Sequence, residues 1–361
     1  MNDTTYMKQA LELAKRGCGW VAPNPMVGAV IVKDGKVIAE GWHEHYGELH
    51  AERNALKKCT QSPEGATMYV TLEPCCHHGK QPPCVDAIIE AGISRVVVGS
   101  PDPNPLVAGK GIQILKDHGI EVTEHVLKEE CDRLNAVFFH YIRTGLPYVV
   151  MKYAMTLDGK IATTTGASKW ITGEEARNHV QQQRHKYTAI MVGVETVLAD
   201  DPMLTCRIEG GRSPIRIICD TTLRTPLSAN VVQTAKEVRT IFATCCENQE
   251  QHKLYQELGC EIVVVGQYKG HVNLAELMQK LGEQQIDSIL LEGGGTLNWS
   301  AMEQGIVQKV QAYVAPKLFG GFLAKSPVEG NGVLTPMDAM HITKSTITQL
   351  GEDFLIEGEV S

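Results

Sequence analysis

The residue types that most clearly predict chemistry are one histidine, one glutamate and two cysteines in the first half of the chain. His50 and Glu52 are separated by one residue, and Cys75 and Cys84 lie in the sequence TLEPCCHHGKQPPC at residues 71–84. One imidazole and two thiolates make three zinc ligands, which leaves a fourth coordination position for water. The pattern therefore predicts a catalytic zinc site rather than a closed structural one.

Glu52 is expected to act on protons rather than on the metal. Residues two apart on a helix do not share a face, so Glu52 is a poor fourth ligand beside His50. Zinc lowers the pKa of a bound water to roughly 7, and a carboxylate next to that water can shuttle its proton. Two alternatives stay open: a structural zinc site, which needs a fourth protein ligand that is not evident, and buried cysteines beside a core histidine. Cys76 is an alternative ligand to Cys75.

The second half carries charged residues and a glycine run that are only suggestive alone. The sequence LEGGGT at residues 291–296 follows an apolar stretch, so its backbone N–H groups could hold a phosphate at the start of a helix. It lacks the G-x-G-x-x-G spacing of a Rossmann site, and a tight turn is the plainer interpretation. Arg184 and Arg207 suit a sugar phosphate because a guanidinium donates two parallel hydrogen bonds, although either could be a solvated surface charge.

The segment 71–84, with PNPMVG at 23–28 and DPNPLVAG at 102–109, resembles the deaminase half of the bifunctional deaminase-reductases of riboflavin biosynthesis. That half belongs to the zinc-dependent cytidine-deaminase superfamily, whose usual pattern is H-x-E followed by P-C-x-x-C. Here the second spacing is wider, as is typical of the riboflavin branch. The resemblance implies a three-layer α/β/α domain in which Glu52 is catalytic. It implies zinc ligation by His50, Cys75 and Cys84, and a substrate pocket lined by Asn24, His43, His77 and Lys80.

Further blocks resemble the reductase half of the same family, which is similar in fold to dihydrofolate reductase and uses NADPH. They are KYAMTLDGKIA at 152–162, SKWIT at 168–172, VGVETVLADDP at 192–202, LTCR at 204–207 and LEGGGT at 291–296. The implied NADPH contacts are Ala154, Trp170, Thr196, Asp200, Thr221 and the loop Gly294, Gly295, Thr296, Leu297, Asn298, Trp299 and Ser300. The implied substrate contacts are Lys152, Ser168, Arg184, Leu204, Arg207 and Glu292.

This resemblance implies two successive reactions on a phosphorylated pyrimidine. A zinc-bound hydroxide would replace the 2-amino group of 2,5-diamino-6-(5-phosphoribosylamino)pyrimidin-4(3H)-one, with Glu52 moving the protons. NADPH would then pass hydride to C1′ of the sugar, giving 5-amino-6-(5-phosphoribitylamino)uracil. Lys152 and Asp200 lie near the expected reaction centre of this second step, and either could handle its proton. In this reading the NADPH carries the hydride chemistry and the protein supplies orientation.

Hydrophobic periodicity predicts two α/β domains that could position these residues. The first half follows the order α-β-β-α-β-α-β-α-β, and the residues 128–142 that follow are expected to be helical and amphipathic. The sequence RTGLP at 143–147 breaks the pattern, so we place a zinc-dependent deaminase domain at 1–145 and an NADPH-dependent reductase domain at 146–361. In the second domain, buried strands are expected at 148–155, 189–194, 215–220, 240–243, 261–265, 288–291 and 307–316. Thr172 and Glu175 fit a capping box for the helix that follows them.

Composition narrows the class of protein. The 361 residues are 43% hydrophobic and 21% charged, which excludes wholesale disorder. The formal net charge of −8 opposes nucleic acid as a partner, and so opposes a nucleic-acid deaminase. No apolar run reaches the ~18 residues of a membrane span, and the first residues lack the pattern of a signal peptide.

The remaining expectations concern compartment and assembly. The eleven cysteines favour a reducing compartment, so we expect a cytoplasmic enzyme. We also expect a homo-oligomer, either a dimer or a tetramer. An inactive second half is a further alternative, which the presence of Lys152, Asp200, Arg207 and Glu292 opposes.

Overall fold

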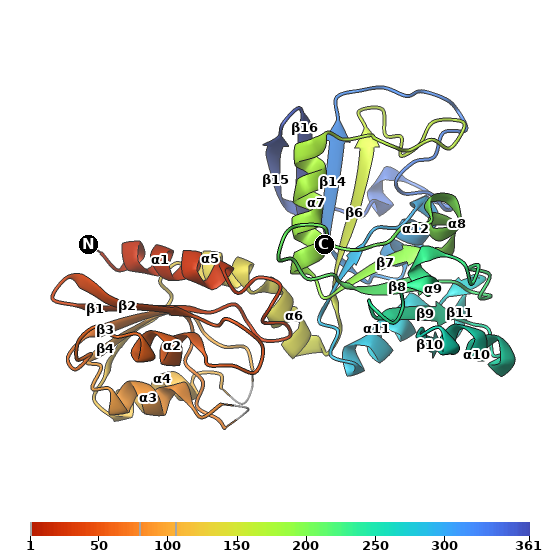
Figure 1. The fold of residues 1–361 in the computed structure, drawn as a ribbon. Coiled ribbons are helices and arrows are strands. Elements are labelled where there is room, and N and C mark those ends of the chain that lie inside the picture. Colours follow the sequence, from red (N-terminus) through yellow and green to blue (C-terminus); the bar gives the residue numbers. More distant parts are fainter. Residues whose placement is uncertain (1, 79–80, 105–106) are drawn as a thin grey trace. The chain divides into compact units, whose positions relative to one another are not determined.

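A computed structural model describes residues 2–78, 81–104 and 107–361, so the candidate pocket residue Lys80 lies outside the described residues. The chain divides into two compact units, residues 1–145 and 146–361 (Figure 1). No helix among the described residues is both long enough and apolar enough to cross a membrane.

The first unit is built on a five-stranded mixed sheet in the order β2-β1-β3-β4-β5. Its central strands are apolar on both faces, as expected of strands covered on two sides. Strand β1 is antiparallel to β2 and β3, whereas β3, β4 and β5 are parallel. The strands are β1 (Gly28–Lys33), β2 (Lys36–Trp42), β3 (Thr67–Leu72), β4 (Arg95–Ser100) and β5 (Glu121–Thr123).

Helices cover both faces of this sheet and give three layers (Figure 1). One core joins β-strand residues to Ala51 and Ala55 of α2, Ile88 of α3 and Leu115 of α4, and a second core joins the opposite face to α1 and α5. The predicted α/β/α architecture is therefore confirmed. The helices are α1 (Asp3–Lys15), α2 (Ala51–Lys57), α3 (Cys84–Glu90), α4 (Lys110–Asp117), α5 (Lys128–Leu134) and α6 (Ala136–Thr144).

Residues 128–142 are helical as expected, but they form two helices, α5 and α6, which are separated at Asn135. The buried Asn135 side chain accepts a hydrogen bond from the Met26 backbone N–H (2.8 Å) and donates one to the Met26 carbonyl (2.9 Å). The Asn135 side chain thus ties the point where the two helices meet to the segment before β1.

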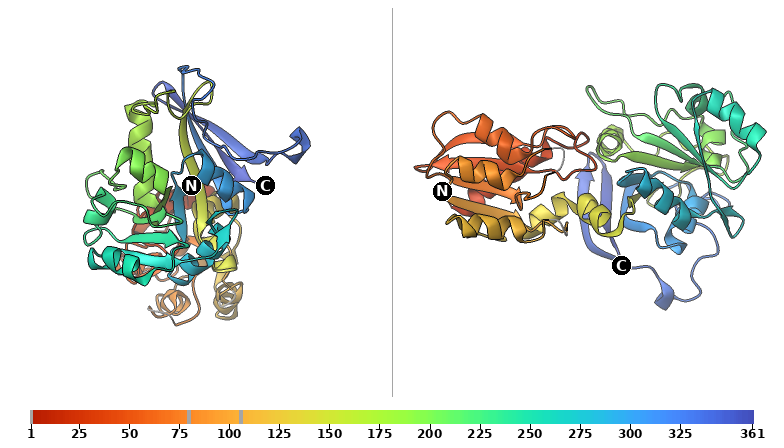
Figure 2. Two further views of the ribbon diagram at one scale, coloured as in Figure 1. Left: turned by 90° about the vertical axis from the view of Figure 1, so that its right-hand side faces the viewer. Right: turned by 90° about the horizontal axis from the view of Figure 1, so that it is seen from below.

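The second unit is built on a nine-stranded sheet in the order β10-β9-β8-β7-β13-β6-β14-β16-β15. The strands from β10 to β14 in this order are parallel, and β16 and β15, at the blue end of the colour range, extend the sheet in antiparallel fashion (Figure 2). The strands are β6 (Tyr148–Thr156), β7 (Ala189–Gly193), β8 (Ile215–Cys219), β9 (Thr240–Thr244), β10 (Glu261–Val264), β13 (Ser288–Leu291), β14 (Val307–Ala315), β15 (Ile342–Leu350) and β16 (Asp353–Val360). A separate hairpin pairs β11 (Gln267–Tyr268) with β12 (His271–Val272).

Helices again pack on both faces of the parallel part. The helices α11 and α12 contribute to one buried core, and α8, α9 and α10 to the other. Parallel strands place their carboxyl ends at one edge of a sheet, which is where ligands bind in open α/β folds. The helices are α7 (Glu174–Lys186), α8 (Val194–Asp200), α9 (Asn230–Gln233), α10 (Gln249–Glu257), α11 (Leu274–Glu283) and α12 (Gly295–Glu303), with a 3₁₀ turn at Pro336–Asp338.

The capping box expected at Thr172 is wrong. Helix α7 begins after Gly173, and no side chain caps it. The Gly173 N–H donates instead to Oδ2 of Asp353 (2.7 Å), and the Thr172 carbonyl accepts from Arg177 Nη1 (2.7 Å). The tertiary contact with Asp353 thus replaces the local cap.

Candidate active sites

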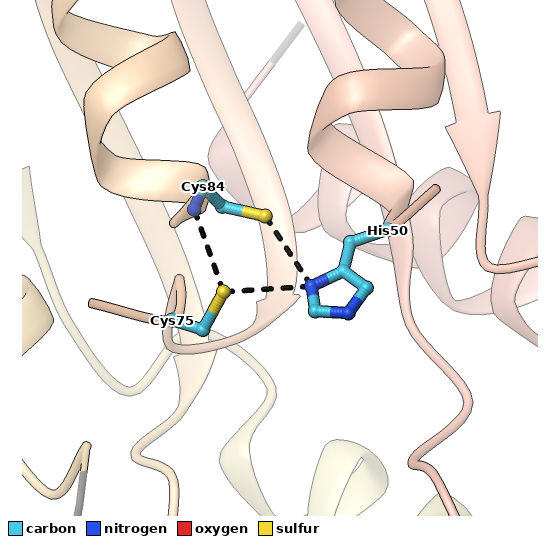
Figure 3. A group of neighbouring side chains, drawn as sticks. All are labelled: His50, Cys75 and Cys84. Carbon is cyan, nitrogen blue, oxygen red and sulfur yellow. Dashed lines mark hydrogen bonds between the residues drawn. The ribbon is translucent and has the colours of Figure 1, made fainter. Parts of the chain in front are cut away.

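The first unit brings His50, Cys75 and Cys84 together at one point (Figure 3). The Nδ1 atom of His50 lies 3.4 Å from Sγ of Cys75 and 3.4 Å from Sγ of Cys84. His50 directly precedes α2, Cys84 opens α3, and Cys75 lies in the segment that follows β3. Two helix starts and one strand end thus converge, and their ligand atoms all lie within 4.8 Å of one another.

The electrostatics of the two thiols fit a metal. A hydrogen bond from the Cys84 thiol is the main cause that lowers the pKa of Cys75, to about 4. Burial opposes this shift, and the nearby His50 adds to it. The same hydrogen bond to Cys75, together with burial, raises the pKa of Cys84. The pKa of one thiol is thus lowered and that of the other raised, as expected of two thiols that share a site able to hold a cation. One imidazole and two thiols are a zinc donor set, and no fourth His, Cys, Asp or Glu joins them among the described residues.

Glu52 lies beside this cluster on the first turn of α2. Glu52 is 3% exposed, and its carboxyl hydrogen-bonds with the Cys84 thiol. Burial and the negative charge of Cys75 raise the pKa of Glu52 to about 7. A carboxyl with such a pKa can both accept and release a proton near neutral pH.

His43 and Asn24 form a polar pair against the cluster. The His43 ring meets the His50 ring edge-on with 5.4 Å between centroids. Its Nδ1 donates to the Leu49 carbonyl (3.0 Å), so Nε2 of the neutral ring accepts from the Asn24 amide (3.1 Å). Burial lowers the pKa of His43 and favours this neutral form. The Asn24 amide is thus held in one orientation beside the metal ligands.

His77, a third expected pocket residue, lies two residues after Cys75. Its Nδ1 atom is buried and has no hydrogen-bond partner among the described residues. A buried imidazole nitrogen without a partner is costly, and a polar group of a bound substrate would satisfy it.

Two residues that hold the metal-binding segments in place were not predicted from the sequence. The buried carboxylate of Glu73 accepts backbone N–H groups from Asp102 (3.2 Å), Gly109 (3.0 Å) and Ile112 (3.2 Å), which ties the 102–112 segment to the strand end that carries Cys75. Arg53 donates to the carbonyls at positions 82 (3.2 Å) and 83 (2.7 Å), directly before Cys84. Glu73 stands inside the 71–84 motif, which was a usable signal, whereas nothing in the sequence marks Arg53.

In the second unit, Lys152, Arg184 and Glu292 form a half-buried charged triad. Nζ of Lys152 lies 3.0 Å from Oε2 of Glu292. Nε and Nη2 of Arg184 lie 2.8 and 3.1 Å from its two oxygens. Burial opposes ionisation of Glu292, but Arg184 and Lys152 outweigh it and lower its pKa. Glu292 is therefore a fixed anion between two cations at the carboxyl end of β13, which pairs with the middle of β6.

This pairing changes the role expected for Arg184. Its third nitrogen, Nη1, donates to the Thr205 carbonyl (3.1 Å), so all three guanidinium nitrogens donate within the protein. The fork expected to face a phosphate faces Glu292 instead. Arg207 has an exposed side chain, and its backbone N–H donates to Gln181 on α7 (3.0 Å). The Leu204 side chain is buried in the core, which leaves its backbone for a ligand.

The expected cofactor residues gather at the same edge. Thr196 and Asp200 both lie on α8, and Asp200 forms an ion pair with Lys169 (3.5 Å), next to the half-buried Ser168. Trp170 is 62% exposed, with the Arg177 guanidinium 4.9 Å from its ring centroid, so it is not a core residue. Ala154 on β6 pairs with β14, and Thr221 directly follows Asp220 at the end of β8.

The segment expected as a loop at 294–300 is mostly helix. Gly294 is the extended residue before α12, which starts at Gly295 and has no side-chain cap. Thr296, Leu297, Asn298, Trp299 and Ser300 therefore lie in the first turns of α12. A Cβ atom on Gly294 would meet nothing within 4 Å, so its surroundings are open. On Gly295 it would lie 2.4 Å from Cγ of Glu329, in a segment that packs over the helix start. The uncapped helix start is thus open on the side of Gly294, where backbone N–H groups could meet a phosphate, and covered by Glu329 on the side of Gly295.

Comparison with known protein families matches each unit separately. The cytidine and deoxycytidylate deaminase zinc-binding region matches residues 1–100. The RibD C-terminal domain matches residues 147–356.

Whole-chain relatives match both units at once. The riboflavin biosynthesis protein RibD of Actinobacillus pleuropneumoniae is 56% identical over 357 residues, which is 99% of this chain and 95% of that protein. The protein of the same name from Escherichia coli (strain K12) is 43% identical over 89% of each chain.

Solved structures agree with this match. Acinetobacter baumannii RibD (form 1) has a TM-score of 0.88 at 39% identity, covering 99% of both chains. A diaminohydroxyphosphoribosylaminopyrimidine deaminase/5-amino-6-(5-phosphoribosylamino)uracil reductase from Thermotoga maritima has a TM-score of 0.86 at 39% identity and the same coverage. The chain therefore belongs to the RibD family of bifunctional deaminase/reductase enzymes of riboflavin biosynthesis.

Proposed function

We propose that the first unit deaminates 2,5-diamino-6-(5-phosphoribosylamino)pyrimidin-4(3H)-one and that the second unit reduces the ribosyl chain of the product to ribityl. The observation that supports this proposal most strongly is the convergence of His50, Cys75 and Cys84 beside the buried Glu52. The substrate class is supported by the name of the Thermotoga maritima relative, which is similar over nearly the whole chain.

In the deaminase step, His50, Cys75 and Cys84 would hold one zinc ion per chain. A zinc ion bound there would supply the Lewis acidity that activates water at neutral pH. Glu52 takes a proton from the attacking water and delivers protons to the ring nitrogen and to the departing ammonia. Asn24, fixed by the neutral His43, binds the pyrimidine edge, and His77 offers its buried Nδ1 to the same ligand. Lys80 is proposed to meet the phosphate.

In the reductase step, the edge of the parallel sheet would hold NADPH and the sugar. NADPH, when bound, supplies hydride to the sugar C1′. The uncapped start of α12 (294–300) binds its phosphates, and Ala154, Trp170, Thr196, Asp200 and Thr221 bind the rest.

The sugar and pyrimidine of the reductase substrate lie against the charged triad. Glu292 accepts hydrogen bonds from the ligand hydroxyl groups, and Lys152 donates hydrogen bonds to them. The Lys152 ammonium is the proton source that the triad offers to the ligand. Arg184 keeps Glu292 ionised and in place. The remaining contacts are Ser168, the Leu204 backbone and the exposed Arg207, which is free to turn toward the phosphate.

The enzyme would act on a small anionic molecule in the cytoplasm rather than on nucleic acid, which the net charge of −8 opposes. A homo-oligomer is proposed because the C-terminal segment carries large apolar side chains with little cover. Phe322, Leu334, Met337 and Ile347 are 99%, 96%, 89% and 70% exposed. A second copy of the chain would bury them.

Metal analysis tests the zinc assignment. The purified chain should carry about one zinc by plasma mass spectrometry, and Cys84→Ser should lose it together with the deaminase activity. Cys206→Ser, which changes a cysteine of the second unit, is the matched control and should keep the metal. A metal-free chain that still deaminates would remove the cluster from the mechanism.

A further inference from the structure

We propose that Arg224 distinguishes NADPH from NADH by binding the 2′-phosphate on the adenosine ribose. The inference rests on the proposed use of NADPH by the second unit and names the specificity residue of that site. Nothing in the motifs of the sequence marks Arg224, which lies in the turn DTTLRT at residues 220–225 after β8.

The topology places Arg224 between two proposed cofactor contacts. Strands β7 and β8 are parallel neighbours, and Gly193 at the end of β7 pairs with Cys219 at the end of β8. The residues that follow the two strands therefore emerge side by side at the carboxyl edge of the sheet. An ion pair between Arg224 and Glu195 on α8 joins them directly. Thr196 is the next residue on α8, so the guanidinium lies close to a proposed NADPH contact.

The turn that carries Arg224 is held by buried hydrogen bonds. Oδ2 of Asp220 accepts the Thr225 N–H (2.8 Å) and the Thr225 hydroxyl (2.7 Å). The Leu223 carbonyl accepts from Gln251 Nε2 (2.7 Å) and from the Tyr255 hydroxyl (3.0 Å). Because the Leu223 side chain is buried, this backbone cannot shift without disturbing the core. The turn is thus a fixed base for an outward-pointing arginine.

The chemistry of the pair suits a phosphate that arrives with the cofactor. The side chains of Arg224 and Glu195 are 50% and 71% exposed, and an ion pair in water contributes little, so a phosphate dianion can replace Glu195. A guanidinium donates two parallel N–H bonds to a phosphate. It has no acceptor for the 2′-hydroxyl of NADH, which dinucleotide enzymes usually bind with a carboxylate. Asp220, the acid of the same turn, is fully buried, and its Oδ2 atom accepts from Thr225.

Arginine replacement tests the proposal through cofactor preference. In Arg224→Gln, the ratio of kcat/KM for NADPH to kcat/KM for NADH should fall by about 10- to 100-fold, the scale of one or two charge-assisted hydrogen bonds. Arg224→Lys keeps the charge but not the fork, so it should retain part of the preference. The matched control is Arg239→Gln, which removes another exposed arginine paired with a glutamate, Glu261, at the opposite end of the strands. Its ratio should stay within about twofold of wild type.

A binding experiment separates this inference from the proposed function. Isothermal titration should show that adenosine 2′,5′-bisphosphate binds the wild-type chain more tightly than 5′-AMP and that Arg224→Gln removes the difference. A variant that keeps the wild-type preference in both assays would overturn the role of Arg224 and leave only a surface ion pair. If the wild-type chain oxidised neither NADPH nor NADH, the proposed function would fail. If the wild-type chain bound adenosine 2′,5′-bisphosphate and 5′-AMP equally, the role of Arg224 would be overturned as well.

Discussion

Glu73→Gln is the change whose consequence can be followed furthest from the structure of the first unit. The Glu73 carboxylate accepts two backbone N–H groups on Oε2, from Asp102 and Gly109, and one on Oε1, from Ile112. Close packing surrounds this contact, since a Cβ atom on Gly111 would lie 2.2 Å from the carbonyl at position 74. The 102–112 segment is thus held against the strand end that carries the metal ligand Cys75.

An amide can present its single oxygen at only one of the two carboxylate positions. Placed at Oε2 it keeps two acceptor contacts, and its NH₂ group then faces the Ile112 N–H. Loss of one buried bond to a charged acceptor costs about 1.5–3 kcal/mol, and the two remaining bonds weaken because the charge is gone. We expect the first unit to lose about 3 kcal/mol of unfolding free energy, which lowers its Tm by roughly 10 °C.

Calorimetry and hydrogen exchange measure this loss directly. Glu73→Gln should lower the unfolding transition of the first unit, and amides in the 101–112 peptide should exchange faster while those of the second unit do not. Glu12→Gln is the control, because Glu12 is exposed and forms a surface ion pair with Lys15, so its effect should stay below about 0.5 kcal/mol. A fall in Tm of less than about 2 °C with unchanged exchange would refute the reasoning.

Three further outcomes are expected. Glu52→Gln should keep the zinc and slow deamination by at least ~10²-fold, the usual scale for a general acid–base; an undiminished rate would exclude Glu52 from proton transfer. Arg207→Ala should raise the KM for the pyrimidine substrate in the reductase assay and leave deamination unchanged, and equal damage to both steps would mean that the sites are not independent. Arg184 and Lys152 lower the pKa of Glu292 despite its burial, so their stabilisation is complete above the unfolded glutamate pKa of ~4.3 and is lost as the pH falls below it. Tm of the second unit should therefore drop more steeply below about pH 4 in wild type than in Glu292→Gln, and parallel curves would contradict the triad.

Much of the fold was predictable because its signals are local. Strand 67–72 and strand 288–291 occur at the expected residues, since short apolar runs between turns determine them. The family, the two α/β units and the bifunctional activity followed from motifs, and the comparisons confirm them. The candidate metal ligands His50, Cys75 and Cys84 lie together as their spacing suggested, because each lies near the end of a strand or at the start of a helix.

What the sequence did not reveal depends on contacts between distant segments. The Asn135 side chain joins the point between α5 and α6 to Met26, and Asp353 replaces a local cap at Gly173. The pairing of Arg184 with Glu292 joins residues more than one hundred positions apart, so the arginine appeared free to bind phosphate. Such tertiary partners leave no periodicity in the sequence, and only coordinates reveal them.

The central claim is that one chain performs both reactions in order. The direct measurement is to supply the diaminopyrimidinone ribosyl phosphate with and without NADPH and to identify the products by mass spectrometry. We predict ammonia and the deaminated ribosylaminouracil phosphate without NADPH, and the ribitylamino product with an equal amount of NADPH oxidised when the cofactor is present. Unchanged substrate in both reactions, or a deaminated product that NADPH does not reduce, would contradict the account.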